Sequence, residues 1–410
     1  MSNLPPLSKC HDMAQNAYIF NQLVSLLPRD HFEYLVGKYG GNLYVKHYTC
    51  WNHFLVLLWA QLTGRESIRD IESSLRAHSD KLYRLGMGTG VSRNNIAHAS
   101  LTRPVGIFRD FAQRVMECAL RSASPKESAL SRIAESLSVN GFLAIDSSLI
   151  RFDIERFPWS SEQQGKGGLK LHTMYDTLRE MPALCLLTGH EMRDQTFMDD
   201  YPYRKGAVYM LDKAYVKTPS LYAIDRAGAY FVVRRKRRMA YEVLESYPVS
   251  DPLVYADRRI RFKLRWAREG YPAPLRIVQY YSPERNELLE FLSNNFTLGA
   301  GSIALAYKNR WTVELFFRWI KQHLYVTRFY GVSPNAVAMQ IYVAVVAYSL
   351  VALAGTAYGF KGSSYELLRV LSVSTMERRS LKELIDRYGN PLLDDRHTAG
   401  ETPSLFDGLF

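Results

Sequence analysis

Cysteine is scarce in this sequence and is not spaced for cross-linking. Four of the 410 residues are cysteine, scattered without Cys-x-x-Cys spacing or companion histidines: Cys10, Cys50, Cys118 and Cys185. A disulfide framework and a structural zinc site both need such spacing. The scarcity argues against a disulfide-stabilised fold and against a zinc module, and we expect a protein of the reducing cytoplasm.

Long apolar runs are rare as well. The N-terminal residues include prolines and polar side chains where a secretion signal would have an apolar segment. One run, residues 341–354, is apolar apart from a serine and two tyrosines. It is shorter than the roughly 20 residues that cross a bilayer. We predict a buried core helix for this run, and no membrane partner.

The GxxxxGK[ST] loop of nucleotide-binding proteins is missing, and the GKGG run at residues 165–168 lacks its spacing. We therefore expect no nucleotide cofactor. Acidic residues are outnumbered, with 40 Asp and Glu against 52 Lys and Arg, so the net charge is +12. This excess suits a polyanionic partner. A hydrophobic content of 47% over this length allows two or three domains with packed cores.

Residues 307–321, YKNRWTVELFFRWIK, have the apolar spacing of one amphipathic helix. At about 100° per residue, Tyr307, Arg310, Glu314 and Lys321 fall on one face of that helix, within about 60° of each other. The opposite face is apolar and can pack against a core. The helix is thus predicted to present a single carboxylate among cations.

That polar face has the composition of a phosphate site. Glu314 is the residue of the four that could hold a divalent cation, because hard cations take oxygen ligands. Arg310 and Lys321 would then suit a phosphate beside the metal. We predict one wall of a metal-dependent phosphoryl-transfer site. The alternative is a surface helix with an ordinary ion pair between Arg310 and Glu314.

Two aspartates follow apolar, strand-like runs earlier in the chain. The run GFLAI brings Asp146 to its end, and the run GAVYML brings Asp212 to its end. Three carboxylates from distant positions can hold two cations about 3.5–4 Å apart, as two-metal phosphoryl transfer requires. We predict Asp146, Asp212 and Glu314 as the catalytic and metal-binding set, with Asp225 as the main competitor for the second position.

The spacing of Tyr307, Arg310, Glu314 and Lys321, with Trp311 directly after the arginine, resembles the Y-R-E-K signature of bacterial insertion-sequence transposases of the DDE class. The resemblance extends over nearly the whole chain. It implies a mixed α/β fold with a ribonuclease H-like catalytic core. The strand and helix order between the first aspartate and the basic run near residue 236 agrees with such a core.

The resemblance also implies a domain order. It places a helical, helix-turn-helix-like DNA-binding domain for the transposon ends at residues 1–125. The catalytic core follows at 136–236 and 301–358, interrupted by a β-rich insertion at 237–300. C-terminal helices and a mobile tail are expected at 359–410. Around Asp212 the family usually has Arg-Gly where this chain has Lys213 and Ala214, which puts the local turn geometry in doubt.

The implied activity is cut-and-paste transposition. Two Mg²⁺ ions per active site, with Mn²⁺ as a substitute, would activate water to nick the transposon end. The freed 3′ hydroxyl would attack DNA, first to form a hairpin and then to join the target. A homodimer on double-stranded DNA is implied. In relatives an aromatic residue of the insertion holds a flipped base; Phe291 and Phe296 are available here, without a choice between them.

Residues expected to contact DNA form several groups. The residues are Tyr307, Arg310, Trp311 and Lys321 of the signature, Arg93, Asn94 and Arg103 of the N-terminal domain, Lys170 and His172 of a basic strand, and the run Arg234, Arg235, Lys236, Arg237 and Arg238. For the N-terminal group the alternative is a plain helical bundle, and for the basic strand it is an exposed polar strand. For the basic run the alternative is a solvated basic face. For the whole protein, the alternatives are a nuclease without strand transfer and a catalytically silent DNA-binding protein.

Overall fold

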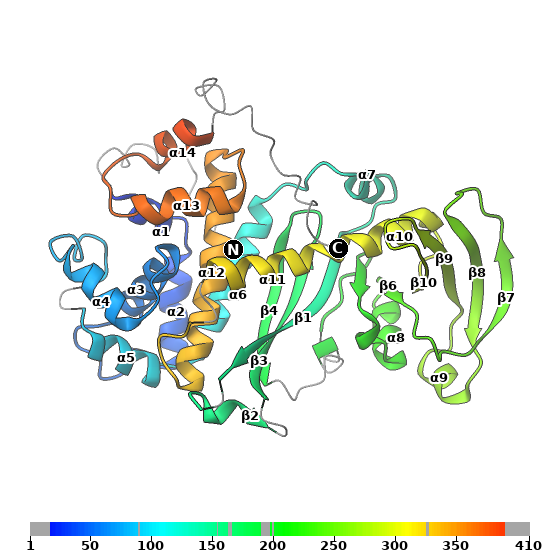
Figure 1. Cartoon of the computed structure of the whole chain (residues 1–410), viewed down its shortest axis with the longest axis horizontal. Helices are drawn as coiled ribbons and strands as arrows, with labels where there is room; N and C mark the ends of the chain where they lie inside the picture. The colour runs from blue at the N-terminus through cyan, green and yellow to red at the C-terminus, as the bar shows by residue number, and fades with distance from the viewer. Residues whose placement is uncertain are drawn as a thin grey trace.

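The computed structural model describes residues 17–88, 91–153, 155–162, 166–189, 197–198, 201–324 and 328–389. The tail expected to be mobile lies outside these residues from position 390 onward, as do residues 1–16 of the expected N-terminal domain. The chain forms a helical part and a large twisted sheet, with two helices running across the sheet (Figure 1).

Helices make up most of the N- and C-terminal regions. They are α1 (Ile19–Val24), α2 (Arg29–Tyr39), α3 (Cys50–Leu62), α4 (Ile68–Arg76), α5 (Arg93–Thr102), α6 (Val105–Ser122), α7 (Ala129–Ser136), α8 (Thr218–Arg226), α9 (Arg265–Gly270), α10 (Ala300–Asn309), α11 (Thr312–His323), α12 (Pro334–Tyr358), α13 (Ser364–Ser374) and α14 (Leu381–Gly389). Several begin at a residue whose side chain accepts a backbone N–H, such as Thr49, Ser67 and Ser92. These caps fix where the helices start.

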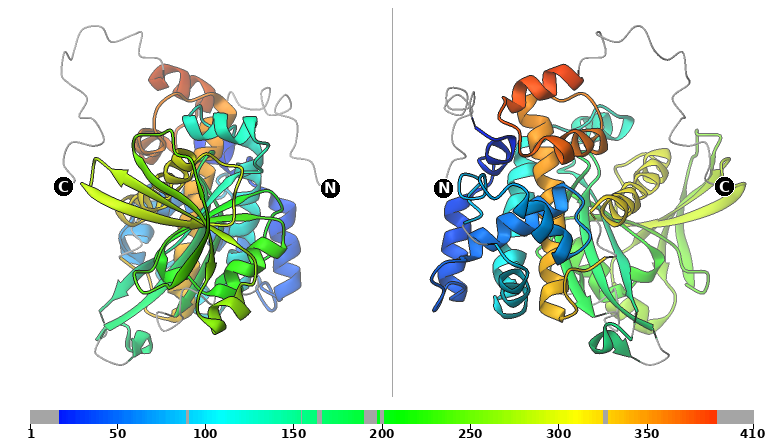
Figure 2. Two further views of the ribbon diagram at one scale, coloured as in Figure 1. Left: turned by 90° about the vertical axis from the view of Figure 1, so that its right-hand side faces the viewer. Right: turned by 60° about the vertical axis from the view of Figure 1, so that its left-hand side comes forward.

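In the part of the chain that the structure describes, ten strands form one sheet. They are β1 (Phe142–Phe152), β2 (Ser161–Glu162), β3 (Lys166–Asp176), β4 (Met181–Gly189), β5 (Val208–Leu211), β6 (Tyr230–Arg234), β7 (Tyr241–Tyr247), β8 (Val254–Phe262), β9 (Leu275–Ser282) and β10 (Glu287–Ser293). Their order is β2-β3-β1-β5-β6-β10-β9-β8-β7, and β4 pairs with β3. Figure 2 shows the strands fanning apart, as the twist of a long sheet requires.

The central part of this sheet has the ribonuclease H-like arrangement. Strands β4, β3 and β1 are antiparallel neighbours, whereas β5 and β6 run parallel to β1 on its other side. Helix α8 connects β5 to β6, as the parallel pairing demands. The predicted mixed α/β fold with a ribonuclease H-like core is confirmed.

The β-rich segment after residue 237 extends the same sheet. Strand β10 pairs with β6 and β9, and β8 and β7 follow outward. Backbone hydrogen bonds therefore connect this segment to the core strands without interruption. Within the segment predicted to be β-rich, β8 ends at Phe262 and the short helix α9 follows.

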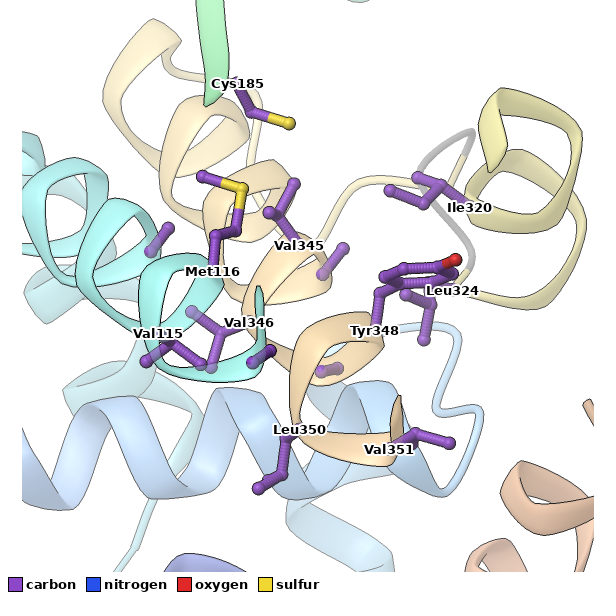
Figure 3. Close-up of a cluster of buried hydrophobic side chains, with 14 of the residues drawn as sticks. Val115, Met116, Cys185, Ile320, Leu324, Val345, Val346, Tyr348, Leu350 and Val351 are labelled. Atoms are coloured by element: carbon purple, nitrogen blue, oxygen red, sulfur yellow. The ribbon is translucent and has the colours of Figure 1, made fainter. Parts of the chain in front are cut away.

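Helix α12 is the centre of the helical part. It is long and apolar enough to cross a membrane, yet 89% of its most apolar window is buried inside the protein. Figure 3 shows Val345 and Val346 of α12 beside Val115 and Met116 of α6, while Tyr348 lies toward α11. The prediction of a buried core helix is confirmed. This helix supports the back of α11 through a Phe316–Tyr348 ring contact, with centroids 4.9 Å apart.

One hydrophobic cluster joins α1–α6 to α11–α14 and to one face of the sheet. The N-terminal helices therefore share their core with the rest of the chain. Asn335, at the start of α12, donates hydrogen bonds to the carbonyls of Ser100 (3.0 Å) and Arg103 (2.8 Å) at the end of α5. Helices α4 and α5 contact each other, and whether they act as a helix-turn-helix stays a prediction.

The stretch predicted as one helix, residues 307–321, consists of parts of two. A tight turn at Arg310 and Trp311 separates α10 from α11, and the N–H groups of these residues donate to carbonyls three residues back, at 3.1 and 3.2 Å. Both residues keep right-handed helical angles. The two helices therefore continue in nearly the same direction (Figure 1). The single-helix prediction is wrong at this turn.

Candidate active site

The parallel pairing of β1 with β5 determines where the two aspartates lie. The register pairs Ile145 with Leu211, so Asp146 and Asp212 come next on neighbouring strands. Adjacent strands are about 4.8 Å apart. Asp212 directly follows the last residue of β5, as predicted. Asp146 does not end its strand, because β1 continues to Phe152 through its pairing with β3.

The two aspartates face the side of the sheet that carries α11. Along β1, Ala144 and Ile150 belong to the cluster that includes α11 and α12, whereas Ile145 belongs to the cluster around α8. Because side chains alternate between the faces of a strand, Asp146 lies on the α11 side with Ala144. Met210 of β5 also faces α11, and the same alternation places Asp212 on that side.

Arg310 links Asp146 to Glu314. One guanidinium nitrogen lies 2.5 Å from Asp146 Oδ2, and another lies 2.7 Å from Glu314 Oε1. The side chain of Arg310 is 14% exposed, that of Asp146 19% and that of Glu314 32%. The other oxygen of Asp146 accepts the backbone N–H of Ser147 at 2.8 Å. The intrahelical ion pair considered as an alternative does exist, but it extends to a second carboxylate on the sheet.

Burial and charge shift the pKa values of these groups. Burial raises the pKa of Asp146, and the Arg310 guanidinium opposes part of that rise. Burial alone would lower the pKa of Arg310, but the charge of Asp146, with Tyr307 and Glu314, raises it above the ordinary value. Arg310 therefore remains a cation at every pH where the protein is folded.

Tyr307 lies on the other side of Arg310. Its ring packs on Phe291 of β10, with centroids 4.8 Å apart. Burial raises the pKa of Tyr307, Arg310 lowers it and the nearby charge of Asp212 raises it further. The hydroxyl is thus a neutral donor between the second aspartate and Arg310. Phe291 is 1% exposed, so it has no free face for a DNA base.

Lys321 lies at the opposite end of the site. Its Nζ donates to the carbonyl of Leu149 on β1 at 3.0 Å. Burial lowers its pKa, and the charge of Arg151 lowers it further. Lys321 is one wall of a pocket of about 470 Å³ that also contains Asp146 and Glu314. Trp311, at the helix turn, is 41% exposed.

Five lining residues of this pocket were not predicted as site residues: Ser147, Ser148, Phe317, Arg318 and Gln322. Ser148 follows Asp146 by two positions on β1, so it shares that face of the strand. Arg318 and Gln322 lie on α11 with Glu314. The signal was available for Arg318, because residues four apart on a helix share a face. The pocket therefore holds an additional cation.

Asp225 has a structural environment. It accepts hydrogen bonds from the Tyr271 hydroxyl and from Asn294 Nδ2, each at 2.8 Å. It belongs to α8, whose buried residues Leu221 and Ile224 pack on the sheet face opposite α11. Asp225 is therefore on the wrong side of the sheet to replace Asp212.

Two predicted DNA contacts on β3 lie away from this site. The β1–β3 register pairs His172 with Ser147 and Lys170 with Leu149, so both side chains are on the face opposite Asp146. His172 is fully buried, stacks on Phe197 and contacts the Thr188 hydroxyl at 2.9 Å. The prediction that His172 contacts DNA is wrong, because this ring is part of the core. Lys170 stays a prediction for DNA contact and cannot stabilise the carboxylate site.

The N-terminal candidates divide in the same way. Arg93 and Asn94 are exposed on the first turn of α5. Arg103 is 6% exposed, and its guanidinium donates to the carbonyls of Tyr48 and Thr49. The prediction of Arg103 as a DNA contact is wrong, because these carbonyls hold the side chain inside the helical part.

The basic run after β6 is partly engaged within the protein. Arg234 forms an ion pair with Glu287, and Arg235 Nε donates to Glu290 at 2.6 Å. Both acids come from β10, so these two arginines link neighbouring strands. Arg234 also influences Tyr307 electrostatically, which places it near the site.

The remainder of that run is more open. Lys236 Nζ donates to the carbonyl of Val216 at 3.0 Å. Arg237 and Arg238 are exposed in the turn before β7. An exposed pair of arginines next to the sheet edge is available for phosphate contacts. All five residues of the run stay predictions as DNA contacts.

The donor set fits a hard divalent cation in kind, since all three candidates are carboxylates. Among the described residues, however, no three His, Cys, Asp or Glu side chains are close enough together to hold a metal ion. Arg310 stands between Asp146 and Glu314. The three carboxylates thus share one face of the sheet without forming a closed ligand cluster.

Two family models match the chain. One, described as Transposase DDE domain, matches residues 138–350, and the other, described as Domain of unknown function (DUF4372), matches residues 15–88. The first match covers just over half of the chain and includes all three carboxylates. The chain belongs to the DDE transposase family. The family resemblance predicted from the sequence is confirmed, and enzymes of this family generally use divalent metal ions.

Curated relatives are named as transposases. The y4zB protein of Sinorhizobium fredii is 32% identical over 203 residues, which cover 48% of this chain and 56% of that protein. A protein named for insertion sequence element IS5377 of Geobacillus stearothermophilus is 27% identical over 216 residues, 50% of this chain and 54% of that protein. The chain spans about half the length of the curated relatives it matches.

One solved structure shows a weak similarity to this DDE transposase family member. It is a cryo-EM structure of the piggyBac transposase synaptic complex with hairpin DNA, at 12% identity and a TM-score of 0.42, covering 93% of this chain and 84% of that chain. The fold assignment rests on the strand order of the sheet itself.

Proposed function

We propose that this protein is a DNA transposase that moves an insertion sequence by cutting and pasting. It would nick DNA at the ends of the element by hydrolysis and join the freed 3′ hydroxyl groups to target DNA. The observation that supports this most is that Asp146, Asp212 and Glu314 share the sheet face covered by α10 and α11. Arg318 and Lys321, two cations that suit a phosphate, line one pocket with Asp146 and Glu314.

Asp146, Asp212 and Glu314 would hold the metal, two Mg²⁺ ions per site with Mn²⁺ as a substitute. When bound, the metal would lower the pKa of the attacking water and neutralise the leaving oxygen. Arg318 and Lys321 would bind the phosphate in the pocket. Tyr307, neutral because burial raises its pKa and close enough to Asp212 to be influenced by its charge, would donate a hydrogen bond to a phosphate at the Asp212 end of the site.

The wider DNA interface is proposed on charge and exposure. Arg93 and Asn94 on α5 would contact the ends of the element, and Arg237 and Arg238 would contact the backbone near the site. Two ends must be processed together, so we propose a homodimer on double-stranded DNA. Action on chromosomal or plasmid DNA would place the protein in the cytoplasm.

A hairpin intermediate belongs to this proposal. Of the two insertion phenylalanines, Phe291 is buried, whereas Phe296 is 43% exposed with Arg259 5.9 Å from its ring centroid. Phe296 is therefore our candidate for stacking on a flipped base. Changing Phe296 to Ala should reduce the hairpin product on a denaturing gel and leave the first nick intact; an undiminished hairpin would eliminate this residue.

The proposal is tested with purified full-length protein, Mg²⁺ or Mn²⁺ and labelled DNA carrying the element's own ends. Wild type is compared with Glu314→Gln, which removes the negative charge of the carboxylate and keeps the size and shape of the side chain. We expect cleavage and joining to fall by about 10²- to 10³-fold or more, with DNA binding retained. A wild-type protein that cuts but never joins pre-cut ends would be a nuclease. A wild type that binds without cutting would be a DNA-binding protein.

A further inference from the structure

We propose that Arg310 occupies the cation position of the active site until DNA arrives, and that a DNA phosphate then draws it away so that a divalent cation can bind. This inference rests on the proposed function and adds a control step to it. It concerns the order of events at one site. Metal and DNA would each make the other bind more tightly.

The contacts of Arg310 are those that a metal would need. Its guanidinium lies 2.5 Å from Asp146 Oδ2 and 2.7 Å from Glu314 Oε1, and so bridges two carboxylates from different elements. Asp146 Oδ1 is already engaged by the N–H of Ser147. One oxygen of each carboxylate, Asp146 Oδ2 and Glu314 Oε1, is therefore engaged by the arginine.

A divalent cation and this arginine exclude each other. A Mg²⁺ ion requires carboxylate oxygens at about 2.0–2.1 Å, and the guanidinium occupies the space between the same oxygens. Two cations that close would also repel each other strongly in a site where Asp146 is largely buried. Metal entry at Asp146 and Glu314 therefore requires Arg310 to move.

A phosphate offers Arg310 an alternative partner of equal quality. Guanidinium binds phosphate through two parallel hydrogen bonds, as it binds carboxylates. Asp146 and Glu314, the two carboxylates that Arg310 bridges, line a pocket together with Arg318 and Lys321, and these two cations would bring a phosphate to this place. Arg310 would then exchange two carboxylates for one phosphate, and the carboxylates would become available to the metal. Because binding free energies are linked, the coupling must act equally in both directions.

Lys321 is the control for Arg310, because it is a cation of the same site that does not bridge carboxylates. Its Nζ donates to the Leu149 carbonyl and not to a carboxylate. Removing Lys321 lowers the positive charge of the same pocket but frees no metal ligand. Comparing Arg310 with Lys321 thus separates ligand release from a general change in potential.

The test is Mn²⁺ binding to full-length protein, measured by electron paramagnetic resonance of free Mn²⁺, with and without a short DNA duplex. Without DNA, Arg310→Met should bind Mn²⁺ at least about fivefold more tightly than wild type. Lys321→Met should change the affinity less. Adding the duplex should tighten Mn²⁺ binding to wild type and leave Arg310→Met nearly unchanged. Equal or weaker binding by Arg310→Met, or an equal gain in Lys321→Met, would overturn the inference.

Thermal unfolding and circular dichroism establish that each variant is folded. Arg310→Lys is a second variant, because an ammonium keeps the charge but lacks the planar fork that bridges two carboxylates. Its Mn²⁺ affinity should fall between those of wild type and Arg310→Met. If Arg310→Met does not fold, the lysine variant decides: tighter binding than wild type supports the exchange, and unchanged or weaker binding refutes it.

This outcome is separable from that of the proposed function. If the Arg310 variants bind Mn²⁺ more tightly but wild type never joins DNA ends, the proposed exchange of Arg310 is supported and the proposed transposase function is refuted. If wild type joins DNA ends but the variants gain no Mn²⁺ affinity, the transposase function is supported and the exchange is refuted.

Discussion

Two arginine–carboxylate sites in this molecule use the same chemistry in opposite ways. Arg276 on β9 forms two hydrogen bonds with Asp257 of the neighbouring strand, at 2.8 and 2.6 Å, and donates to the carbonyls of Asn295 and Leu298. Both charged side chains are under 10% exposed. Arg310 instead bridges two carboxylates of separate elements, and both of these carboxylates line a pocket.

The difference lies in what each arginine could exchange. Arg276 has four acceptors, which are both oxygens of one carboxylate and two backbone carbonyls. Arg310 has two acceptors, one on each of two carboxylates that also suit a metal, and both carboxylates line a pocket with Arg318 and Lys321. Both ion pairs are next to a pocket, since Asp257 and Arg276 line one of about 590 Å³. What distinguishes them is that carbonyls also hold Arg276 in place, whereas Arg310 bridges carboxylates alone. The following predictions test that distinction.

The largest effect is expected at Arg276. Arg276→Met leaves the Asp257 carboxylate buried without a counter-charge, so the free energy of unfolding should fall by about 3–5 kcal/mol. Urea unfolding monitored by circular dichroism measures the change. The double variant Asp257→Leu, Arg276→Met should recover most of it, but not all, because two carbonyls still lose their donor. A stable single variant would show that Arg276 is not structural.

A buried histidine gives a further comparison, because the charge that acts on it is that of another cation, Arg103. His53 in α3 is fully buried and contacts the Ser100 hydroxyl at 3.1 Å. Burial, and then the charge of Arg103, hold its pKa well below 6.5. The unfolded chain therefore takes up a proton below pH about 6.5 that the folded protein refuses, and stability is lost as the pH falls.

For this single group the loss should reach about 2 kcal/mol at pH 5. Urea unfolding at pH 7 and pH 5 measures it, with His53→Gln as the comparison. The variant should lose less stability on acidification than wild type, whatever its stability at pH 7. Parallel losses in both proteins would mean that His53 becomes charged without cost, contrary to its burial.

A smaller effect is expected at Arg310. Arg310 and its two carboxylates are partly exposed, at 14%, 19% and 32%, so Arg310→Met should lower the free energy of unfolding by about 1–2 kcal/mol, less than Arg276→Met. Mn²⁺ should reverse the loss by binding to the freed carboxylates, and the same Mn²⁺ concentration should not rescue Arg276→Met. Measuring both variants in parallel gives the comparison directly. Equal destabilisation would remove the distinction between the two arginines.

The smallest effect on stability is expected at Lys321. Its hydrogen bond to the Leu149 carbonyl lies at the pocket wall, so Lys321→Ala should change the free energy of unfolding by less than about 0.5 kcal/mol. DNA binding should weaken and become less sensitive to salt, since one phosphate contact is lost. Filter binding over a range of salt concentrations measures this. An unchanged salt slope would place Lys321 outside the DNA interface.

The sequence predicted the parts of the fold that depend on local pattern. The apolar run before Asp212 predicted a buried strand with an acid at its end, and β5 has that form. The apolar run at 341–354 predicted a core helix. The family signature also predicted that Glu314 would join the two aspartates; the structure links Glu314 to Asp146 through Arg310, and the catalytic set of three stays a prediction.

Other features depend on contacts between distant residues. The burial of Arg103 depends on the carbonyls of Tyr48 and Thr49, about 54 positions earlier. His172 is buried against Phe197 and Thr188, which come 25 and 16 positions later in the chain. The link from Arg310 to Asp146 spans 164 positions. Since a short-range pattern carries no information on such pairs, the sequence alone indicated only the Arg310–Glu314 half of it.

The continuous sheet has a mechanical consequence. Strand β10 is hydrogen-bonded to β6, and β6 is connected through β5 to β1, so the outer strands and the strand of Asp146 belong to one rigid sheet. Two hinged domains could change their separation to close on DNA, whereas strands of one sheet keep theirs. DNA bound by the outer strands would therefore lie at a fixed distance from the carboxylates, and the DNA would have to bend to bring its phosphate to them.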